Sequence, residues 1–225
     1  MTAETKQLIR TLTEKVKPVR RPAGPGLRAL IWLGFSLLYI GAFLLIMPAR
    51  HDVTLNPNDR LFLIEQTAAF ATGVTAALAA FASVVPGYTR KWAALPLLPF
   101  AIWLASLGPG CIQELNRFGI EHLPLIHNPW CVPFIVLFGA LPAVLITAML
   151  RTGAPLTPHL TAALGGLAAA GLANVGVRIV HPEDVSIMLL VWHVGSVMAL
   201  SSLAGASGRY FFNWPSVIKK SKFHA

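Results

Sequence analysis

The chain has 225 residues, of which 55% are apolar and 12% are charged, and its mean hydropathy is +0.64. Soluble domains carry about twice that charged fraction, and one of this length could not bury so much apolar surface, so the composition indicates an integral membrane protein. Eighteen Lys and Arg against nine Asp and Glu give a net charge of +9, which in a membrane protein first reports topology rather than nucleic-acid binding. Two cysteines and long apolar runs exclude a disulfide scaffold, collagen and disorder.

The chain opens with a short amphipathic pattern. Leu8, Ile9, Leu12 and Val16 fall on one stripe of a predicted helix that ends before Pro18, and charged side chains lie off that stripe. Such a helix is marginal alone in water and needs a surface. Two surfaces fit, and the pattern does not choose between them: the anionic inner leaflet of a membrane, or a groove on another protein.

Six apolar stretches follow, each long enough to cross a bilayer. They are expected at residues 28–47, 61–85, 92–107, 131–150, 159–180 and 187–205. Because lipid offers no hydrogen-bond partners, spanning segments are helices or closed barrels, and the alternation of barrel strands is absent. The third stretch is interrupted by Pro96 and Pro99, and a turn is expected at Gly108-Pro109-Gly110.

The predicted fold class is therefore an all-α integral membrane protein, a six-transmembrane-helix bundle with a short cytoplasmic N-terminal amphipathic helix. Three parts are expected: an N-terminal segment over residues 1–27, the transmembrane domain over 28–205 and a basic tail over 206–225. The first span is expected to be an uncleaved anchor, because no A-x-A site follows it.

Basic residues predict the orientation of the spans. Fourteen of the eighteen Lys and Arg fall on the side that holds both termini, and seven of the nine acids lie at or beyond the other end. By the positive-inside rule both termini are expected in the cytoplasm of a bacterial cell, with the chain in the inner membrane.

Small residues recur four apart in the fifth span, as at Gly165, Ala169 and Ala173, and again in the second. This spacing allows close approach of helices, either within one bundle or at a dimer interface. Acids are missing from the span centres, and Glu65 is expected only about one turn inside the second span. A proton relay or ion-coupled carrier needs such groups, so this pattern counts against a pump.

Candidate sensing residues gather on the predicted outer side. Cys111 and Cys131 flank one loop, and they either form a disulfide, as cysteines in an oxidising compartment often do, or act as metal ligands together with histidine. His193, inside the sixth span, is expected either to hydrogen-bond a neighbouring helix or to serve as a ligand or switch. A competing class is a membrane redox protein that binds haem or quinone through His193 and the outer histidines, and a small-solute transporter is a third.

In their order and spacing, several short elements resemble the NrsF-like negative regulators, a family of six-span inner-membrane anti-sigma factors. The matching elements are Leu8-Ile9…Leu12, Pro18-Val19-Arg20-Arg21, Val85-Pro86-Gly87, Cys111, Cys131, Leu150-Arg151-Thr152-Gly153-Ala154-Pro155, Pro182-Glu183-Asp184 and Trp192-His193. The resemblance covers residues 5 to 210. It implies a protein that holds an extracytoplasmic-function sigma factor at the membrane and releases it under metal or oxidative stress, with outer-side cysteines involved in sensing.

The resemblance assigns roles to individual residues. The sigma factor is expected to contact Leu8, Ile9, Leu12, Val16, Arg20 and Arg21, whereas sensing or transient heavy-metal binding is expected at Cys131, Cys111, His181, Glu183, Asp184 and His193. The chain departs from the family at His181, where the family has a cysteine before Pro-Glu-Asp, so Cys111 or His181 would replace the usual partner of Cys131. No resident cofactor, no enzymatic activity and no direct contact with nucleic acid are expected.

Overall fold

A computed structural model describes residues 2–14, 23–46, 60–119, 131–153, 155–180 and 186–212. These residues form helices and turns, with no strand among them. The elements are α1 (Ala3–Glu14), α2 (Pro25–Ile46), α3 (Arg60–Ser83), η1 (Arg90–Ala94), α4 (Leu97–Phe118), α5 (Cys131–Leu150), α6 (Pro158–Val180), α7 (Ser186–Met188), η3 (Leu189–Val194), α8 (Gly195–Ala206) and α9 (Gly208–Phe211).

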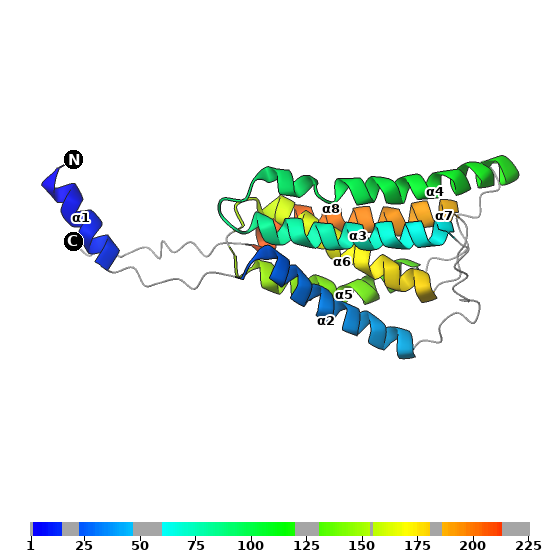
Figure 1. Ribbon diagram of the computed structural model, residues 1–225, viewed down its shortest axis with the longest axis horizontal. Coiled ribbons are helices and arrows are strands. Elements are labelled where there is room, and N and C mark those ends of the chain that lie inside the picture. Colours follow the sequence, from blue (N-terminus) through cyan, green and yellow to red (C-terminus); the bar gives the residue numbers. More distant parts are fainter. Residues whose placement is uncertain are drawn as a thin grey trace.

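Six helices are long and apolar enough to cross a membrane, which confirms the predicted all-α bundle. The third span joins η1 to α4, and the sixth runs through α7, η3 and α8 as one continuous helical segment. Figure 1 shows the spans side by side. We call the end where α2 begins and α8 stops the basic end, and the opposite end, where α4 stops and α7 begins, the far end.

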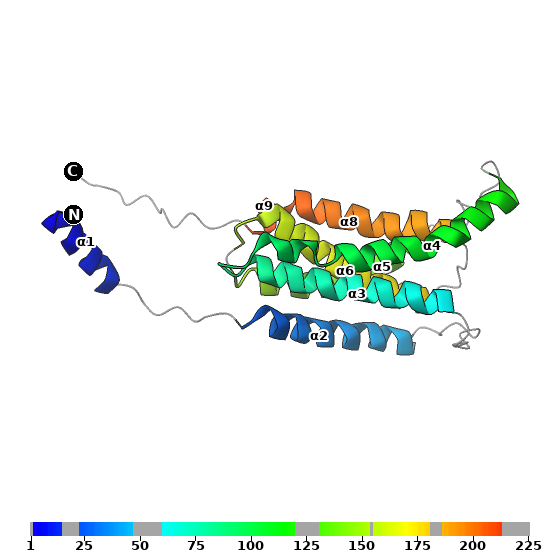
Figure 2. The ribbon, with the colours of Figure 1, turned by 45° about the horizontal axis from the view of Figure 1, so that its top comes forward.

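The expected end of the third span at Leu107 and the turn at Gly108–Gly110 are wrong. Helix α4 continues through both glycines and Pro109 to Phe118. A proline inside a helix removes one backbone hydrogen bond and bends the axis without ending the helix, provided that neighbouring helices support it. Figure 2 shows α4 bending toward its C-terminal end. Cys111 and Glu114 are therefore helical residues rather than loop residues.

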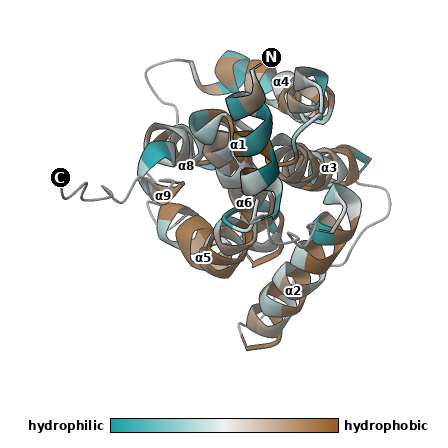
Figure 3. Ribbon diagram, turned by 90° about the vertical axis from the view of Figure 1, so that its left-hand side faces the viewer, coloured by the Kyte–Doolittle hydropathy of each residue, from teal (hydrophilic) through white to brown (hydrophobic). Residues whose placement is uncertain are grey.

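Helix α6 forms the centre of the bundle. In its most apolar stretch 72% of the residues are buried, against at most 39% in any other span, and Figure 3 shows the other spans around it. A Cβ added at Gly73 of α3 would lie 3.2 Å from the backbone of Ala168 and Leu172, and one at Gly166 would lie 2.8 Å from the Ala204 Cβ. The small residues of α6 thus serve close packing inside the bundle.

Side chains at the basic end fasten α2 to α5. The Arg28 guanidinium donates to the Met149 carbonyl and, over 3.0 Å, to the Thr152 hydroxyl, while it lies 4.8 Å from the centre of the Phe81 ring. One turn further on, the Trp32 indole N–H donates to the Pro142 carbonyl over 2.9 Å. These contacts fix the start of α2, the helix that carries the N-terminal segment.

Candidate functional site

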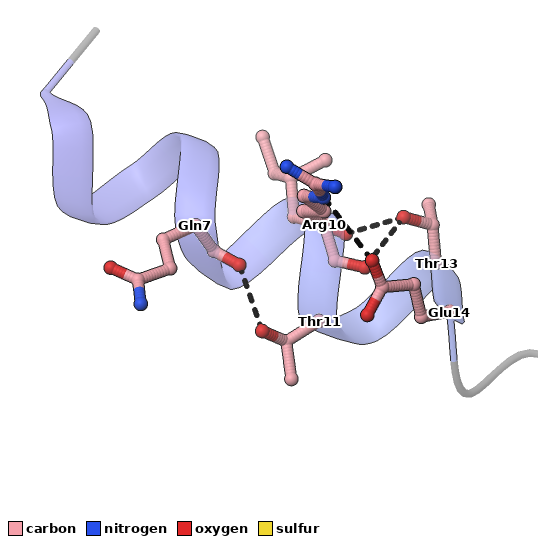
Figure 4. Close-up of polar contacts among 6 residues, drawn as sticks. Gln7, Arg10, Thr11, Thr13 and Glu14 are labelled. Carbon is pink, nitrogen blue, oxygen red and sulfur yellow. Dashed lines mark hydrogen bonds and ion pairs between the residues drawn. The ribbon is translucent and has the colours of Figure 1, made fainter.

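The N-terminal helix α1 is held by local contacts alone among those described. Arg10 Nε lies 3.2 Å from Glu14 Oε1, one turn along the helix. The hydroxyls of Thr11 and Thr13 donate to the carbonyls of Gln7 and Ile9 over 2.9 and 2.8 Å, as Figure 4 shows. An exposed ion pair such as Arg10–Glu14 contributes about 0.3–0.5 kcal/mol to a helix, so α1 needs a partner surface to be stable.

The apolar stripe of α1 is uncovered in the described structure. Leu8, Ile9 and Leu12 are 60%, 44% and 58% exposed, and Figure 1 shows α1 standing apart from the bundle. Val16, Arg20 and Arg21, which the sequence also assigned to partner binding, lie outside the described residues. The helix therefore presents an apolar surface of the kind that a protein groove or a membrane surface would cover.

A second candidate region lies inside the far half of the bundle. Here five side chains form what we call the buried polar cluster: Glu65 and Gln66 of α3, Asn174 and Arg178 of α6, and His193 of η3. His193 Nδ1 lies 2.5 Å from Asn174 Oδ1, and both residues are at least 97% buried. Because the Asn174 oxygen accepts, the imidazole donates from Nδ1. The predicted hydrogen bond from His193 to a neighbouring helix is confirmed.

An ion pair completes the buried polar cluster. Arg178 Nη2 lies 3.7 Å from Glu65 Oε2, and the side chains are 7% and 11% exposed. Arg178 also lies 5.4 Å from the centre of the Phe62 ring. The cavity beside the cluster measures about 10 Å³, which accommodates about one water molecule. A haem or quinone ring would have to displace the helices here.

The outer sensing residues are only partly described. Cys111 is a free, half-buried thiol on α4, and Cys131 opens α5, but its side chain lies outside the described structure. His181, Glu183 and Asp184 also lie outside it. Among the described residues, no three His, Cys, Asp or Glu side chains are close enough to hold a metal ion. The metal and disulfide interpretations both remain predictions.

Glu114 links the cysteine-bearing helix to the start of the sixth span. Its two carboxylate oxygens accept from the backbone N–H groups of Ser186 and Ile187 over 2.7 and 2.9 Å, which satisfies two donors at a helix N-terminus and complements the helix dipole. A Cβ added at Gly110 would lie 1.9 Å from the Ser186 hydroxyl oxygen. The last turns of α4, which carry Cys111, therefore pack directly on the residue that follows segment 181–185.

Sequence reasoning missed Asn174, the pairing of Glu65 with Arg178, and the contact of Glu114 with the start of the sixth span. The sequence did contain a signal for the ion pair. Glu65 and Arg178 carry opposite charges in two predicted spans and lie at the same predicted depth, so each could have been expected to pair with the other. Arg178 was instead counted among the outer-side charges. The turn expected at Gly108-Pro109-Gly110 put Glu114 beyond the third span, so no contact with the sixth span was expected for it.

The geometry defines a class: a multi-pass membrane bundle that carries a separate amphipathic helix with an uncovered apolar stripe. A family model described as "Negative regulator of sigma F" (NrsF) matches residues 12–214. Because the match covers most of the chain, the protein belongs to the NrsF family and is a negative regulator of a sigma factor. The comparison with curated proteins and that with solved structures each found no match.

Proposed function

We propose that this protein is a membrane-bound anti-sigma factor of a bacterial inner membrane, with both termini in the cytoplasm and without enzymatic activity. It sequesters an extracytoplasmic-function sigma factor through its N-terminal segment and makes no direct contact with nucleic acid. The family match supports the regulatory role, and the excess of Lys and Arg on the side of both termini supports the orientation.

The uncovered stripe of α1 carries the assignment of the binding surface. Its leucines are 60% and 58% exposed, and burying a side chain of this size contributes about 1.5–3 kcal/mol. Helices with such stripes commonly dock in hydrophobic grooves. The anchoring of α2 by Arg28 and Trp32 keeps this segment at the membrane, so a sigma factor bound to α1 is withheld from transcription.

We further propose that metal or oxidant is sensed at the far end, with Cys131 as the trigger and His181 or Cys111 as its partner. Thiolates react with oxidants and bind soft metals. The contact between Glu114 and Ser186 supports this site, because it holds the residue after segment 181–185 against the helix that carries Cys111.

The assignment of α1 is tested by co-purification of the sigma factor with the solubilised full-length chain. The test variant is Leu8→Ser with Leu12→Ser. The matched control is Ala3→Ser with Gln7→Ser, which places two serines at the same spacing on the opposite, exposed face of α1. Loss of two buried leucines should weaken binding on the order of a hundredfold or more, whereas the control should bind like the wild type.

Membrane insertion of both variants should be unchanged, because the six spans are untouched. Retention of the sigma factor at wild-type level by the leucine variant would make α1 a leaflet anchor only. Failure of the wild-type chain to retain any sigma factor would reject the proposed function itself.

A further inference from the structure

The sixth span contains a turn that departs from α-helical geometry. Residues Leu189–Val194 form a π-helical turn, closed by a hydrogen bond from the Gly195 N–H to the Leu190 carbonyl five residues earlier. The buried residues repeat at the same interval of five: Met188 and Leu189 are buried, and so are His193 and Val194 five positions later. In an α-helix five residues rotate by about 500°, which would put the two pairs roughly 140° apart.

Polar contacts hold the outer part of this span, which consists of α7 and the π-helical turn at the far end of the bundle. Glu114 accepts from the Ser186 and Ile187 N–H groups, and Asn174 accepts from His193 within the π-helical turn. The π-helical geometry of the turn accommodates one residue more than α-helical geometry would, and both contacts form around it. A π-helical turn inside an α-helix is rare and is frequently found at functional sites.

Close apolar packing holds the inner part, α8. The Ser201 hydroxyl donates to the Ala163 carbonyl over 2.8 Å, and a Cβ added at Gly166 would lie 3.1 Å from the Ser201 Cα. A rotation of α8 by one residue, about 100°, would move Ser201 away from the Ala163 carbonyl and Ala204 away from Gly166. The inner part is therefore the fixed one, and any change of register falls on the outer part.

We propose that the π-helical turn Leu189–Val194 is a register joint: its conversion to α-helix rotates the outer part of the sixth span by about one residue, away from the Glu114 carboxylate. The inference rests on the proposed function, since it supplies the movement by which a stimulus at the far end reaches the bundle. The joint exists in two states because the Glu114 and Asn174 contacts stabilise the π form against the regular hydrogen bonding of the α form.

The direct test removes the extra residue. Deletion of Val191, which is 46% exposed, lets the whole span become α-helical while Glu114, Asn174 and α8 keep their contacts. Hydrogen–deuterium exchange is measured on the purified full-length chain in lipid nanodiscs. In the wild type, amides of Leu190–Gly195 should exchange at least tenfold faster than those of Val197–Ser202. In the deletion variant, the two segments should exchange alike and slowly.

Two results would overturn the joint: equal, slow exchange of both segments in the wild type, or fast exchange at residues 190–195 that persists after the deletion. If the deletion variant fails to insert into the membrane, the comparison of the two segments in the wild type alone decides whether the joint exists. Val191→Ala is the control for loss of the side chain without loss of the residue, and it should exchange like the wild type.

A cellular test connects the joint to release. With CdCl2 or diamide as the stimulus, the deletion variant should retain its sigma factor with at least tenfold less release than the wild type and Val191→Ala. Normal release by the deletion variant would overturn the role of the joint. If the wild type binds no sigma factor, the proposed function fails, and the exchange measurement still decides whether the joint moves.

Discussion

Glu65 of α3 and Arg178 of α6 form an ion pair inside the membrane-spanning bundle, with 3.7 Å between the carboxylate and the guanidinium. The pair lies one helical turn from Asn174, which accepts from His193 of the sixth span. Polar groups of three spans therefore meet at one depth. Together with the close packing of small residues on α3 and α6, these contacts specify which helix faces which.

Removing one charge of this pair should destabilise the bundle much more than replacing both charged residues with leucine. Arg178→Leu removes a counter-charge from the buried Glu65 carboxylate, and such changes destabilise by about 3–5 kcal/mol. The double variant Glu65→Leu with Arg178→Leu removes both charges and should recover most of that loss. Unfolding of the detergent-solubilised chain by denaturant measures both. A double variant as unstable as the single one would show that the two charges act independently.

Much of the fold could be predicted from the sequence, because hydropathy and the need to satisfy backbone hydrogen bonds define spans directly. The ends of five spans lie within three residues of their predicted positions. The third span was predicted too short, because Gly108, Pro109 and Gly110 have strong turn propensities that neighbouring helices override. The π-helical turn could not be predicted, since it depends on contacts that Glu114 and Asn174 make from other helices.

The candidate site was predicted less completely for a similar reason. The stripe of α1 is a local pattern, so Leu8, Ile9 and Leu12 could be named from their spacing. The buried polar cluster is assembled from α3, α6 and η3, and single-sequence periodicity carries no information about which spans are neighbours. His193 could be predicted to need a partner, but Asn174 could not be identified as that partner.

Close packing at α6 gives a second prediction. Gly73→Leu should destabilise the bundle by about 1–3 kcal/mol or more, because its Cβ would press on the backbone of Ala168 and Leu172 at 3.2 Å. Gly34→Leu on α2 is the control, since a Cβ there meets nothing within 4 Å. Thermal unfolding in detergent should separate the two variants. Equal midpoints would contradict tight α3–α6 packing.

Topology is the third prediction. Because fourteen of the eighteen Lys and Arg lie on the side of both termini, reporter fusions at Lys6 and Lys222 should both report cytoplasm. A fusion at Glu121, between the third and fourth spans, should report the periplasm. Termini on opposite sides would require an odd number of spans and would reject the six-span topology.

Sensing at the far end is the fourth prediction. If Cys131 is the trigger, Cys131→Ser should keep the sigma factor bound and should not release it when CdCl2 or diamide is added, because serine neither forms a thiolate nor binds soft metals. This phenotype is the opposite of that expected for the Leu8→Ser, Leu12→Ser variant, which releases without a stimulus. Release from membrane vesicles, followed by immunoblotting of the soluble fraction, measures both.

Cys111 separates the two versions of the sensor. A disulfide between Cys111 and Cys131 requires both thiols, so either serine variant should lose the response. A site made by Cys131 and His181 requires only the Cys131 thiol, so Cys111→Ser should respond normally and His181→Ala should not. Normal release from Cys131→Ser at the wild-type concentration of stimulus would make the outer thiol structural, and the stimulus would then have to act through another part of the bundle.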